Sequence, residues 1–215
     1  MGLTTLLYAS IASAARSFVP RAAAAASSVP HRATAVIDGL QELPLDRYDA
    51  IILDQYGVLH NGEALLDGVA AALERLQDGR KLVVLSNTSK RRAPLIAELP
   101  GRGFRSEWLH DAICSGECCW EALRDSSYAS AVVLGWSDRD SSEYLAGTGV
   151  ALADGSPDVI VAYGPDTIDM ADRELTDFRT TGDIGPYRAL LEDAAARGVP
   201  MLCANPDQKT IDVDG

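Results

Sequence analysis

The sequence predicts an α/β protein in which parallel strands alternate with helices. Short apolar, β-branched runs stand at residues 48–53 and 81–85, and a stretch with helical apolar spacing separates them. A strand, a helix and a second strand of this length form a βαβ unit, whose strands lie parallel and adjacent. The chain has 215 residues, 47% of them hydrophobic and 23% charged, which is enough for a folded core of this class.

The predicted elements follow one another from residue 48 onward. A strand over 48–53 leads into a helix over 64–77, where apolar residues recur at helical spacing, and a second strand covers 81–85. The later elements are helices over 94–99, 116–124 and 187–196 and strands over 112–114, 131–135, 158–163 and 199–203. Residues between 136 and 157 form a looser, acidic stretch without a clear pattern.

Charge divides the chain into two unequal parts. The formal net charge of −12 argues against a nucleic-acid partner, because phosphate contacts need a basic surface. Residues 1–37 nevertheless contain Arg, Ala and Ser but no Asp or Glu, a composition typical of an organellar transit peptide. We therefore predict a targeting or disordered segment over 1–35 and a mitochondrial or plastid location, with cytoplasmic and secretory locations as alternatives. No apolar run is long enough to span a bilayer, so no membrane partner is expected.

The candidate site lies where the first two predicted strands end. Asp54 directly follows the first strand, and Ser86 and Asn87 follow the second. The carboxyl ends of parallel strands meet at one edge of a sheet, where ligands bind, so these side chains are expected to converge. A hydroxyl and backbone N–H groups beside a carboxylate can seat an oxyanion or a phosphate group. The alternative is that Asp54 caps a turn and that Ser86 caps the next helix.

Three motifs in order resemble the haloacid dehalogenase superfamily. They are Asp54-x-Tyr56-Gly57-Val58-Leu59, Leu85-Ser86-Asn87 and Cys203-Ala204-Asn205-Pro206-Asp207. The third is similar to the Asn-Pro-Asp segment of class IIA, the nitrophenylphosphatase-like and pyridoxal-phosphate-phosphatase-like enzymes, and the string Ile37-Asp38-Gly39-Leu40 resembles an uncharacterised hydrolase subfamily of that class. The resemblance implies a Rossmann-like core with an inserted α/β cap of the C2 type. It would place the N-terminal half of the core at 36–114, the cap at 115–206 and the return to the core at 207–215.

The resemblance also implies a chemistry. Asp54 would be the nucleophile of a phosphatase acting on a small phosphorylated metabolite through an aspartyl-phosphate, with Mg²⁺ held by Asp54 and by the backbone carbonyl of Tyr56. Ser86 and Asn87 would bind the phosphoryl group or order its loop. Asn205 and Asp207 would lie near the junction of cap and core and contribute to binding of the substrate or its phosphate group. A homodimer is considered as the assembly.

Two departures from the family pattern leave the activity open. Tyr56 stands where family phosphatases carry a second Asp that protonates the leaving group, and the Asp-x-Tyr-Gly pattern also occurs in haloacid dehalogenases, where the Asp attacks carbon. The third family motif, a Lys in a Gly-Lys-Pro context, and the fourth, an acidic metal-binding motif, are not found before Gly215. We therefore expect a C-terminally truncated member. A dehalogenase-type displacement and an inactive remnant with a binding role are kept as alternatives.

Other polar and aromatic groups are interpreted mainly as structural. The group His110, Cys114, Cys118 and Cys119 matches no zinc spacing and favours structural thiols, and Trp108, Trp120 and Trp136 are assigned to packing. The acidic run Asp166, Asp169, Asp172, Glu174 and Asp177 is expected on a solvated surface of the cap. His60 either contacts the substrate or serves its own loop.

Overall fold

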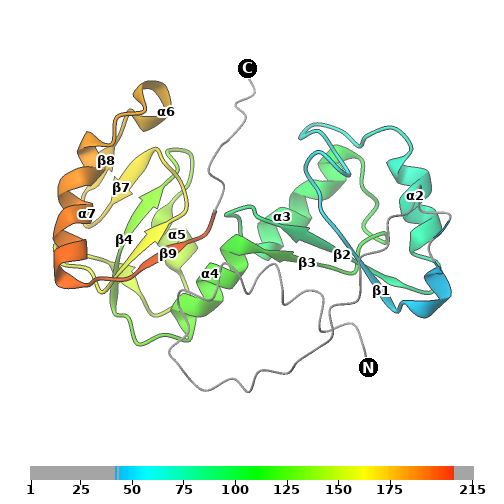
Figure 1. Cartoon of the computed structure of the whole chain (residues 1–215), viewed down its shortest axis with the longest axis horizontal. Coiled ribbons are helices and arrows are strands. Elements are labelled where there is room, and N and C mark those ends of the chain that lie inside the picture. Colours follow the sequence, from blue (N-terminus) through cyan, green and yellow to red (C-terminus); the bar gives the residue numbers. More distant parts are fainter. Residues whose placement is uncertain (1–41, 43, 206–215) are drawn as a thin grey trace. The chain divides into compact units, whose positions relative to one another are not determined.

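The structure, a computed structural model, describes residue 42 and residues 44–205 (Figure 1). A short 3₁₀ turn, η2 (Leu45–Arg47), precedes the first strand. The first sheet is parallel and contains β1 (Ala50–Leu53), β2 (Lys81–Ser86) and β3 (Asp111–Cys114) in that order. The predicted segment 1–35 and the return segment 207–215 lie outside the described residues, so targeting and location stay predictions.

Helices lie between the strands of the first sheet and after its last strand. They are α2 (Val69–Leu76), α3 (Arg92–Glu98), the 3₁₀ helix η3 (Leu99–Arg102) and α4 (Ser115–Arg124), which follows β3. The expected helix start at residue 64 is wrong by five residues. Gly68 has a φ of +81°, a left-handed conformation that a helix interior does not contain, and Leu65 forms a β-bridge with His60. Leu73 and Leu76 bury the apolar side of α2.

The second sheet has six strands in mixed orientation. They are β4 (Ser130–Gly135), β5 (Ala151–Leu152), β6 (Val159–Ala162), β7 (Thr167–Asp169), β8 (Arg173–Leu175) and β9 (Met201–Cys203). The order is β8-β7-β4-β6-β9, with β5 paired beside the start of β4. β5 and β6 run parallel to β4, and β9 runs parallel to β6, whereas β7 and β8 are antiparallel additions. The helices of this part are α5 (Ser141–Leu145), α6 (Phe178–Thr181) and α7 (Gly185–Arg197).

Both faces of the second sheet are covered by apolar side chains. On one face Val133 packs in a cluster with Leu123 of α4 and Tyr144 of α5. On the other face Val132 packs in a cluster with Tyr187 of α7, which lies along the sheet in Figure 1. A strand that is covered on both faces has a continuous run of apolar residues, which is why the sequence predicts β4.

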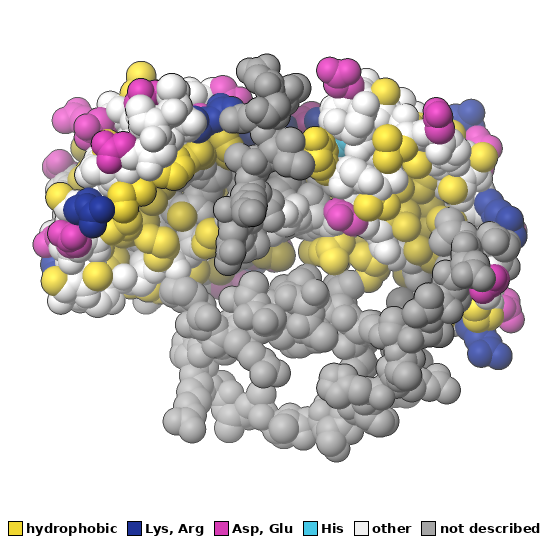
Figure 2. Space-filling view, turned by 45° about the horizontal axis from the view of Figure 1, so that its top comes forward, with side chains coloured by type: hydrophobic (Ala, Val, Ile, Leu, Met, Phe, Trp, Pro, Cys, Tyr) yellow, Lys and Arg dark blue, Asp and Glu magenta, His cyan; other side chains and the backbone are white. Residues whose placement is uncertain are grey.

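The predicted α/β class is confirmed, and most predicted elements differ from the observed ones only at their ends. The division into core and cap at residues 114 and 115 stays a prediction. In the described part of the chain no helix is long and apolar enough to cross a membrane. On the face drawn in Figure 2, apolar side chains are exposed among charged ones.

The expectation that the whole acidic run is solvated is wrong. Asp166 and Asp169 are 7% and 3% exposed, while Asp172, Glu174 and Asp177 are exposed. Asp169 lies in β7, accepts a hydrogen bond from the Ser141 hydroxyl and forms an ion pair with Arg173 at 3.0 Å. A buried carboxylate requires such partners; Arg173 is four residues away, but Ser141 lies 28 positions earlier, which sequence spacing does not reveal.

Candidate active site

Asp54 lies directly after β1 with its side chain exposed. Its Oδ1 accepts a hydrogen bond from the backbone N–H of Gln55 at 2.7 Å. Among the described residues Oδ2 has neither a hydrogen-bond nor an ion-pair partner. One oxygen of the carboxylate is therefore oriented by the backbone, and the other is open to a ligand.

A tight turn follows Asp54 and determines the direction of the chain. The carbonyl of Gln55 accepts the N–H groups of residues 58–60 at 2.7 to 3.3 Å, and the Gly57 N–H donates to the His60 carbonyl at 2.8 Å. Gly57 has a φ of +76°, which favours glycine at this position. The turn leaves the side chain of Tyr56 58% exposed beside Asp54.

Ser86, at the end of β2, is joined to the segment after β1 by a buried hydrogen bond. The Gln55 Nε2 donates to the Ser86 Oγ at 2.7 Å, and the Thr88 N–H donates to the same oxygen at 3.2 Å. Within residues 44–205 the Ser86 hydroxyl donates to no other group, so its hydrogen is available to a ligand. Asn87 follows with an exposed side chain.

Gln55 is the site residue that sequence reasoning missed. It connects the candidate nucleophile's turn with Ser86, although 31 positions separate the two residues. The only signal in the sequence is a polar residue directly after Asp54 that must lie inside the turn. Gln55 is only 6% exposed, so its side-chain amide makes its hydrogen bonds inside the protein rather than with solvent.

His60 is buried in the same turn. Its Nδ1 accepts the Gly62 N–H at 2.9 Å, so the proton of the neutral ring lies on Nε2, which is 3.5 Å from the Gln55 Oε1. The ring makes edge-on contacts with Tyr56 and Phe104. These contacts favour the interpretation that His60 stabilises its own loop. Burial, and secondarily the positive charge of Arg102, lower the pKa of His60 below 6.5.

The lowered pKa of His60 predicts a loss of stability in mild acid. The pKa of His60 is near 6.5 in the unfolded chain and lower in the folded chain. At pH values between these two pKa values, the unfolded chain binds a proton that the folded chain does not. The free energy of unfolding should therefore fall as the pH drops from about 7 through the region below 6.5. Urea unfolding of the wild type and His60→Asn at several pH values measures this. His110, which is exposed, supplies the control variant His110→Asn. If the free energy of unfolding of His60→Asn falls with pH as steeply as that of the wild type, the loss of stability is not due to His60.

The loop after β2 is held from two directions. The Gly116 N–H of α4 donates to the Thr88 carbonyl at 3.0 Å, and a Cβ at Gly116 would lie 2.0 Å from the Ser89 carbonyl oxygen, so only glycine permits this approach. The Trp136 Nε1 and the Arg139 Nη1 each donate to the Ser89 Oγ at 3.2 Å. The loop that carries Ser86 is thus fixed by α4 and by the segment after β4.

The cysteine group has structural contacts. The Cys114 thiol donates to the Lys90 carbonyl at 3.1 Å, and burial raises the pKa of Cys119 to about 11. Cys118 and His110 are exposed. No group of three or more His, Cys, Asp or Glu side chains in the described residues is arranged to hold a metal ion. These contacts favour the interpretation of the cysteines as structural thiols.

Comparison with known proteins identifies the fold around this site. Residues 51–151 match the family model described as haloacid dehalogenase-like hydrolase. This part of the chain is haloacid dehalogenase-like. The resemblance stated from the three sequence motifs is thereby confirmed. No curated protein matches the chain in sequence.

Solved structures share the haloacid dehalogenase-like fold over most of this chain. A hydrolase of this family from Brucella suis 1330 is 25% identical with a TM-score of 0.63, over 80% of this chain and 59% of that one. The 4-nitrophenylphosphatase from Thermotoga maritima is 21% identical with a TM-score of 0.56, over 80% and 60%. NagD from Escherichia coli K-12 is 20% identical with a TM-score of 0.55, over 77% and 58%. The chain therefore spans about three fifths of the length of these structures.

The end of β1 offers oxygen atoms of the type that Mg²⁺ prefers as ligands. Among the described residues the Asp54 Oδ1 accepts only the Gln55 N–H, which leaves it a second lone pair, and the Tyr56 carbonyl accepts no hydrogen bond. Mg²⁺ in phosphate sites is held by one or two protein oxygens, with water and substrate oxygens completing the coordination. The donor set at this end of β1 fits that pattern.

The third sequence motif is only partly described. The Asn205 carbonyl accepts a hydrogen bond from the Cys203 thiol at 3.0 Å, directly after β9. Asp207 lies outside the described residues. The role expected for Asn205 and Asp207 near a junction of cap and core stays a prediction.

Proposed function

We propose that this chain acts as a Mg²⁺-dependent phosphatase on a small phosphorylated metabolite, with Asp54 as the nucleophile. The observation that carries the proposal is the open Oδ2 of Asp54 at the end of β1, on the same sheet edge as the available Ser86 hydroxyl at the end of β2. Similar solved structures support the choice of phosphate esters. They include the 4-nitrophenylphosphatase and a glycerol phosphate phosphatase from Mycobacterium tuberculosis in complexes with magnesium and with calcium.

The proposed reaction has two displacements at phosphorus. In the first, the Asp54 Oδ2 forms a bond to phosphorus while the ester P–O bond breaks, and the leaving oxygen keeps the electron pair and takes a proton from solvent. In the second, water attacks the same phosphorus, its proton passes to solvent, and the P–O bond to Asp54 breaks. The carboxylate is restored and inorganic phosphate is released.

The fixed groups of the site stabilise the phosphoryl oxygens. The Ser86 hydroxyl is oriented by Gln55 and Thr88 before any ligand arrives, so it donates without a cost of reorganisation. Asp54 and the Tyr56 carbonyl would hold Mg²⁺, which would neutralise negative charge on the phosphoryl group. The segments around Ser89 limit the movement of this edge.

Tyr56 favours a second candidate reaction. A carboxylate two residues after the nucleophile is replaced by an exposed phenol, so the site lacks a carboxylic acid for the leaving group at that place. Attack of Asp54 on a carbon that bears a halide needs no such acid, because the halide leaves with its electron pair and water then hydrolyses the aspartyl ester. A chain that only binds its ligand is the remaining alternative.

A metal-dependence measurement tests the phosphatase. We expect the protein to hydrolyse 4-nitrophenyl phosphate with Mg²⁺ present, and EDTA to lower the rate by at least about tenfold, with recovery on addition of excess Mg²⁺. Release of chloride from a 2-chloroacid, measured under the same conditions, is the comparison. Chloride release with no phosphate release would overturn the phosphatase in favour of the displacement at carbon. An absence of both in a folded protein would favour the binding role.

A further inference from the structure

A chain of hydrogen bonds with fixed directions at both ends runs through the candidate active site. At one end the Gly62 N–H donates to the His60 Nδ1 at 2.9 Å, and at the other end the Thr88 N–H donates to the Ser86 Oγ at 3.2 Å. A backbone N–H can only donate, so neither of these two bonds can be reversed. The side chains between the two ends must therefore orient themselves to suit them.

His60 determines which end of the Gln55 amide faces it. Because Nδ1 accepts a hydrogen bond, the neutral ring carries its hydrogen on Nε2, which faces the Gln55 Oε1 at 3.5 Å. The reversed amide would place two donors against each other. The Gln55 Nε2 is thereby directed to the Ser86 Oγ, to which it donates at 2.7 Å. The three side chains are 3% to 6% exposed, so bulk water does not compensate for a wrong orientation.

The Ser86 hydroxyl can only donate to a ligand. Its oxygen has two lone pairs, and these accept hydrogen bonds from the Gln55 Nε2 and the Thr88 N–H. Its hydrogen is donated to no group among the described residues. The Gln55 backbone N–H also donates to the Asp54 Oδ1 at 2.7 Å, so one residue orients both the candidate nucleophile and this hydroxyl.

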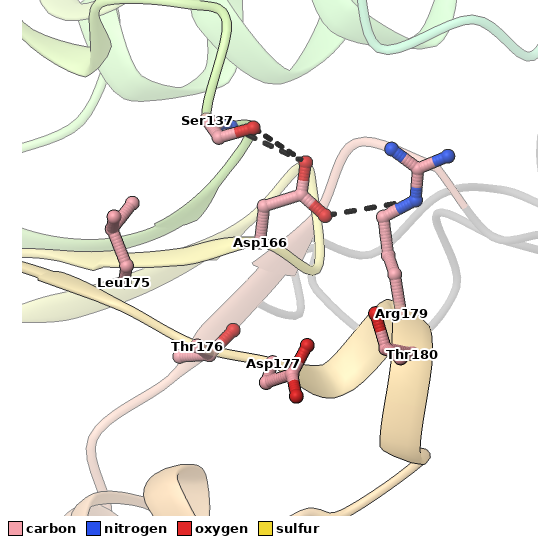
Figure 3. A pocket seen from close by; sticks show the side chains of 7 residues that line it. All are labelled: Ser137, Asp166, Leu175, Thr176, Asp177, Arg179 and Thr180. Atoms are coloured by element: carbon pink, nitrogen blue, oxygen red, sulfur yellow. Dashed lines mark hydrogen bonds and ion pairs between the residues drawn. The ribbon is translucent and has the colours of Figure 1, made fainter.

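The hydroxyl of Ser137 shows the opposite arrangement. It lines a polar cavity of about 390 Å³ in the part of the chain that contains the second sheet. There it donates to the Asp166 Oδ2 at 3.2 Å, and Figure 3 shows the Asp166 carboxylate between Ser137 and Arg179. The hydrogen of Ser137 is engaged, while its oxygen accepts no hydrogen bond from the described residues. Whether a serine donates or accepts thus depends on its partners and not on the residue type.

We infer that His60 is a positioning residue of the active site, which acts through the Gln55 amide to keep the Ser86 hydroxyl directed at the phosphoryl group. The inference rests on the proposed phosphatase function. Without the Nε2–H of His60 the amide can turn over, and Ser86 then donates to the Gln55 Oε1. A lone pair of Ser86 would face the negatively charged phosphoryl oxygen, so a stabilising donor would be replaced by a repulsion.

Two substitutions separate the roles of the two ring nitrogens. His60→Asn keeps an oxygen near the place of Nδ1, which can accept the Gly62 N–H, as the neighbouring Asn61 Oδ1 accepts the Glu63 N–H at 3.0 Å. It lacks the donor at Nε2. His60→Gln places an amide N–H near Nε2 and lacks the acceptor at Nδ1. Both variants remove the ring, so the loss of its packing is common to them.

Steady-state hydrolysis of 4-nitrophenyl phosphate compares the two variants. We expect kcat/KM to fall about tenfold in His60→Asn, a part of the loss that follows removal of a whole donor, and to fall by a smaller factor in His60→Gln. The control His110→Asn replaces an exposed histidine and should keep the wild-type rate. Equal losses in the two His60 variants, or no loss in His60→Asn, would overturn the inference.

A double-mutant cycle shows whether His60 acts through Ser86. Ser86→Ala should lower kcat/KM about a hundredfold, because it removes a donor to the transition state. Adding His60→Asn to Ser86→Ala should lower the rate no further, because no hydroxyl remains to be turned. If His60→Asn has the same effect with and without Ser86, His60 acts on the site by another route and the inference is wrong.

Measurements without turnover separate failure of this inference from failure of the phosphatase. If the wild type hydrolyses no phosphate ester, ¹⁵N NMR at about pH 8 shows which ring nitrogen of His60 carries the hydrogen, and ³¹P NMR measures binding of inorganic phosphate with Mg²⁺ present. A hydrogen on Nε2, together with weaker phosphate binding in His60→Asn than in His60→Gln, supports the inference on its own. A hydrogen on Nδ1, no phosphate binding by the wild type, or equal binding by the two variants overturns it.

Discussion

Replacing Asp54 by Asn should lower the hydrolysis of 4-nitrophenyl phosphate by at least about a thousandfold, because an amide cannot form the aspartyl-phosphate. The Asn side chain keeps an Oδ1 that can accept the Gln55 N–H, so the turn after β1 should remain intact. Steady-state rates at saturating Mg²⁺ measure the effect. They are accompanied by urea unfolding, which should give a midpoint close to that of the wild type.

The control for this variant is Asp78→Asn, an exposed Asp in the turn after α2. It removes the same negative charge from the same part of the chain without touching the end of β1, and it should keep the wild-type rate. If Asp54→Asn keeps more than about a tenth of the wild-type rate, Asp54 is not the nucleophile.

Replacing Tyr56 by Asp should raise the hydrolysis of alkyl phosphates about a hundredfold, which is the scale of general acid catalysis by a positioned side chain. An alkoxide is a poor leaving group without a proton donor, whereas a nitrophenolate leaves readily, so aryl phosphates should gain far less. The side chain of Tyr56 is 58% exposed, so the substitution removes little packing. The ratio of alkyl to aryl turnover, measured for wild type and variant, reports the effect.

Val58→Asp is the matched control for the Tyr56 substitution. Val58 is also exposed in the turn after β1, and a carboxylate there carries the same charge at a different place. We expect no gain for alkyl phosphates in this variant. An equal gain in both variants would show that added charge, rather than a positioned acid, changes the rate.

The position of the site could be predicted from the sequence because it depends on local patterns. The apolar runs before Asp54 and Ser86 predict strands, and the helix between them makes these strands parallel, so both residues fall at one sheet edge. The observed β1 and β2 confirm this placement. Gly57 indicates the sharp turn that follows, and its φ of +76° agrees with it.

The rest of the site depends on contacts between distant segments, which spacing along the chain does not reveal. Gln55 bonds to Ser86 across 31 positions, and Arg139 bonds to Ser89 across 50. The acidic run predicts a solvated surface for Asp166 and Asp169, and β7, with only three residues, is too short to show a strand pattern that would contradict it. Asp169 lies opposite Val133 in the pairing of β7 with β4, and the Asp166 N–H donates to the Gly135 carbonyl at 2.8 Å; no local signal indicates either contact.

The most direct test of Asp54 as the nucleophile is to look for the phosphoryl group on its side chain. The protein is mixed with 4-nitrophenyl phosphate and Mg²⁺, quenched in acid during turnover, digested and analysed by mass spectrometry. We expect a peptide containing Asp54 that carries one added HPO₃ group. That addition should be absent from Asp54→Asn and removed by hydroxylamine, which cleaves acyl phosphates. Turnover in the wild type with phosphate on another residue, or on none, would contradict the account.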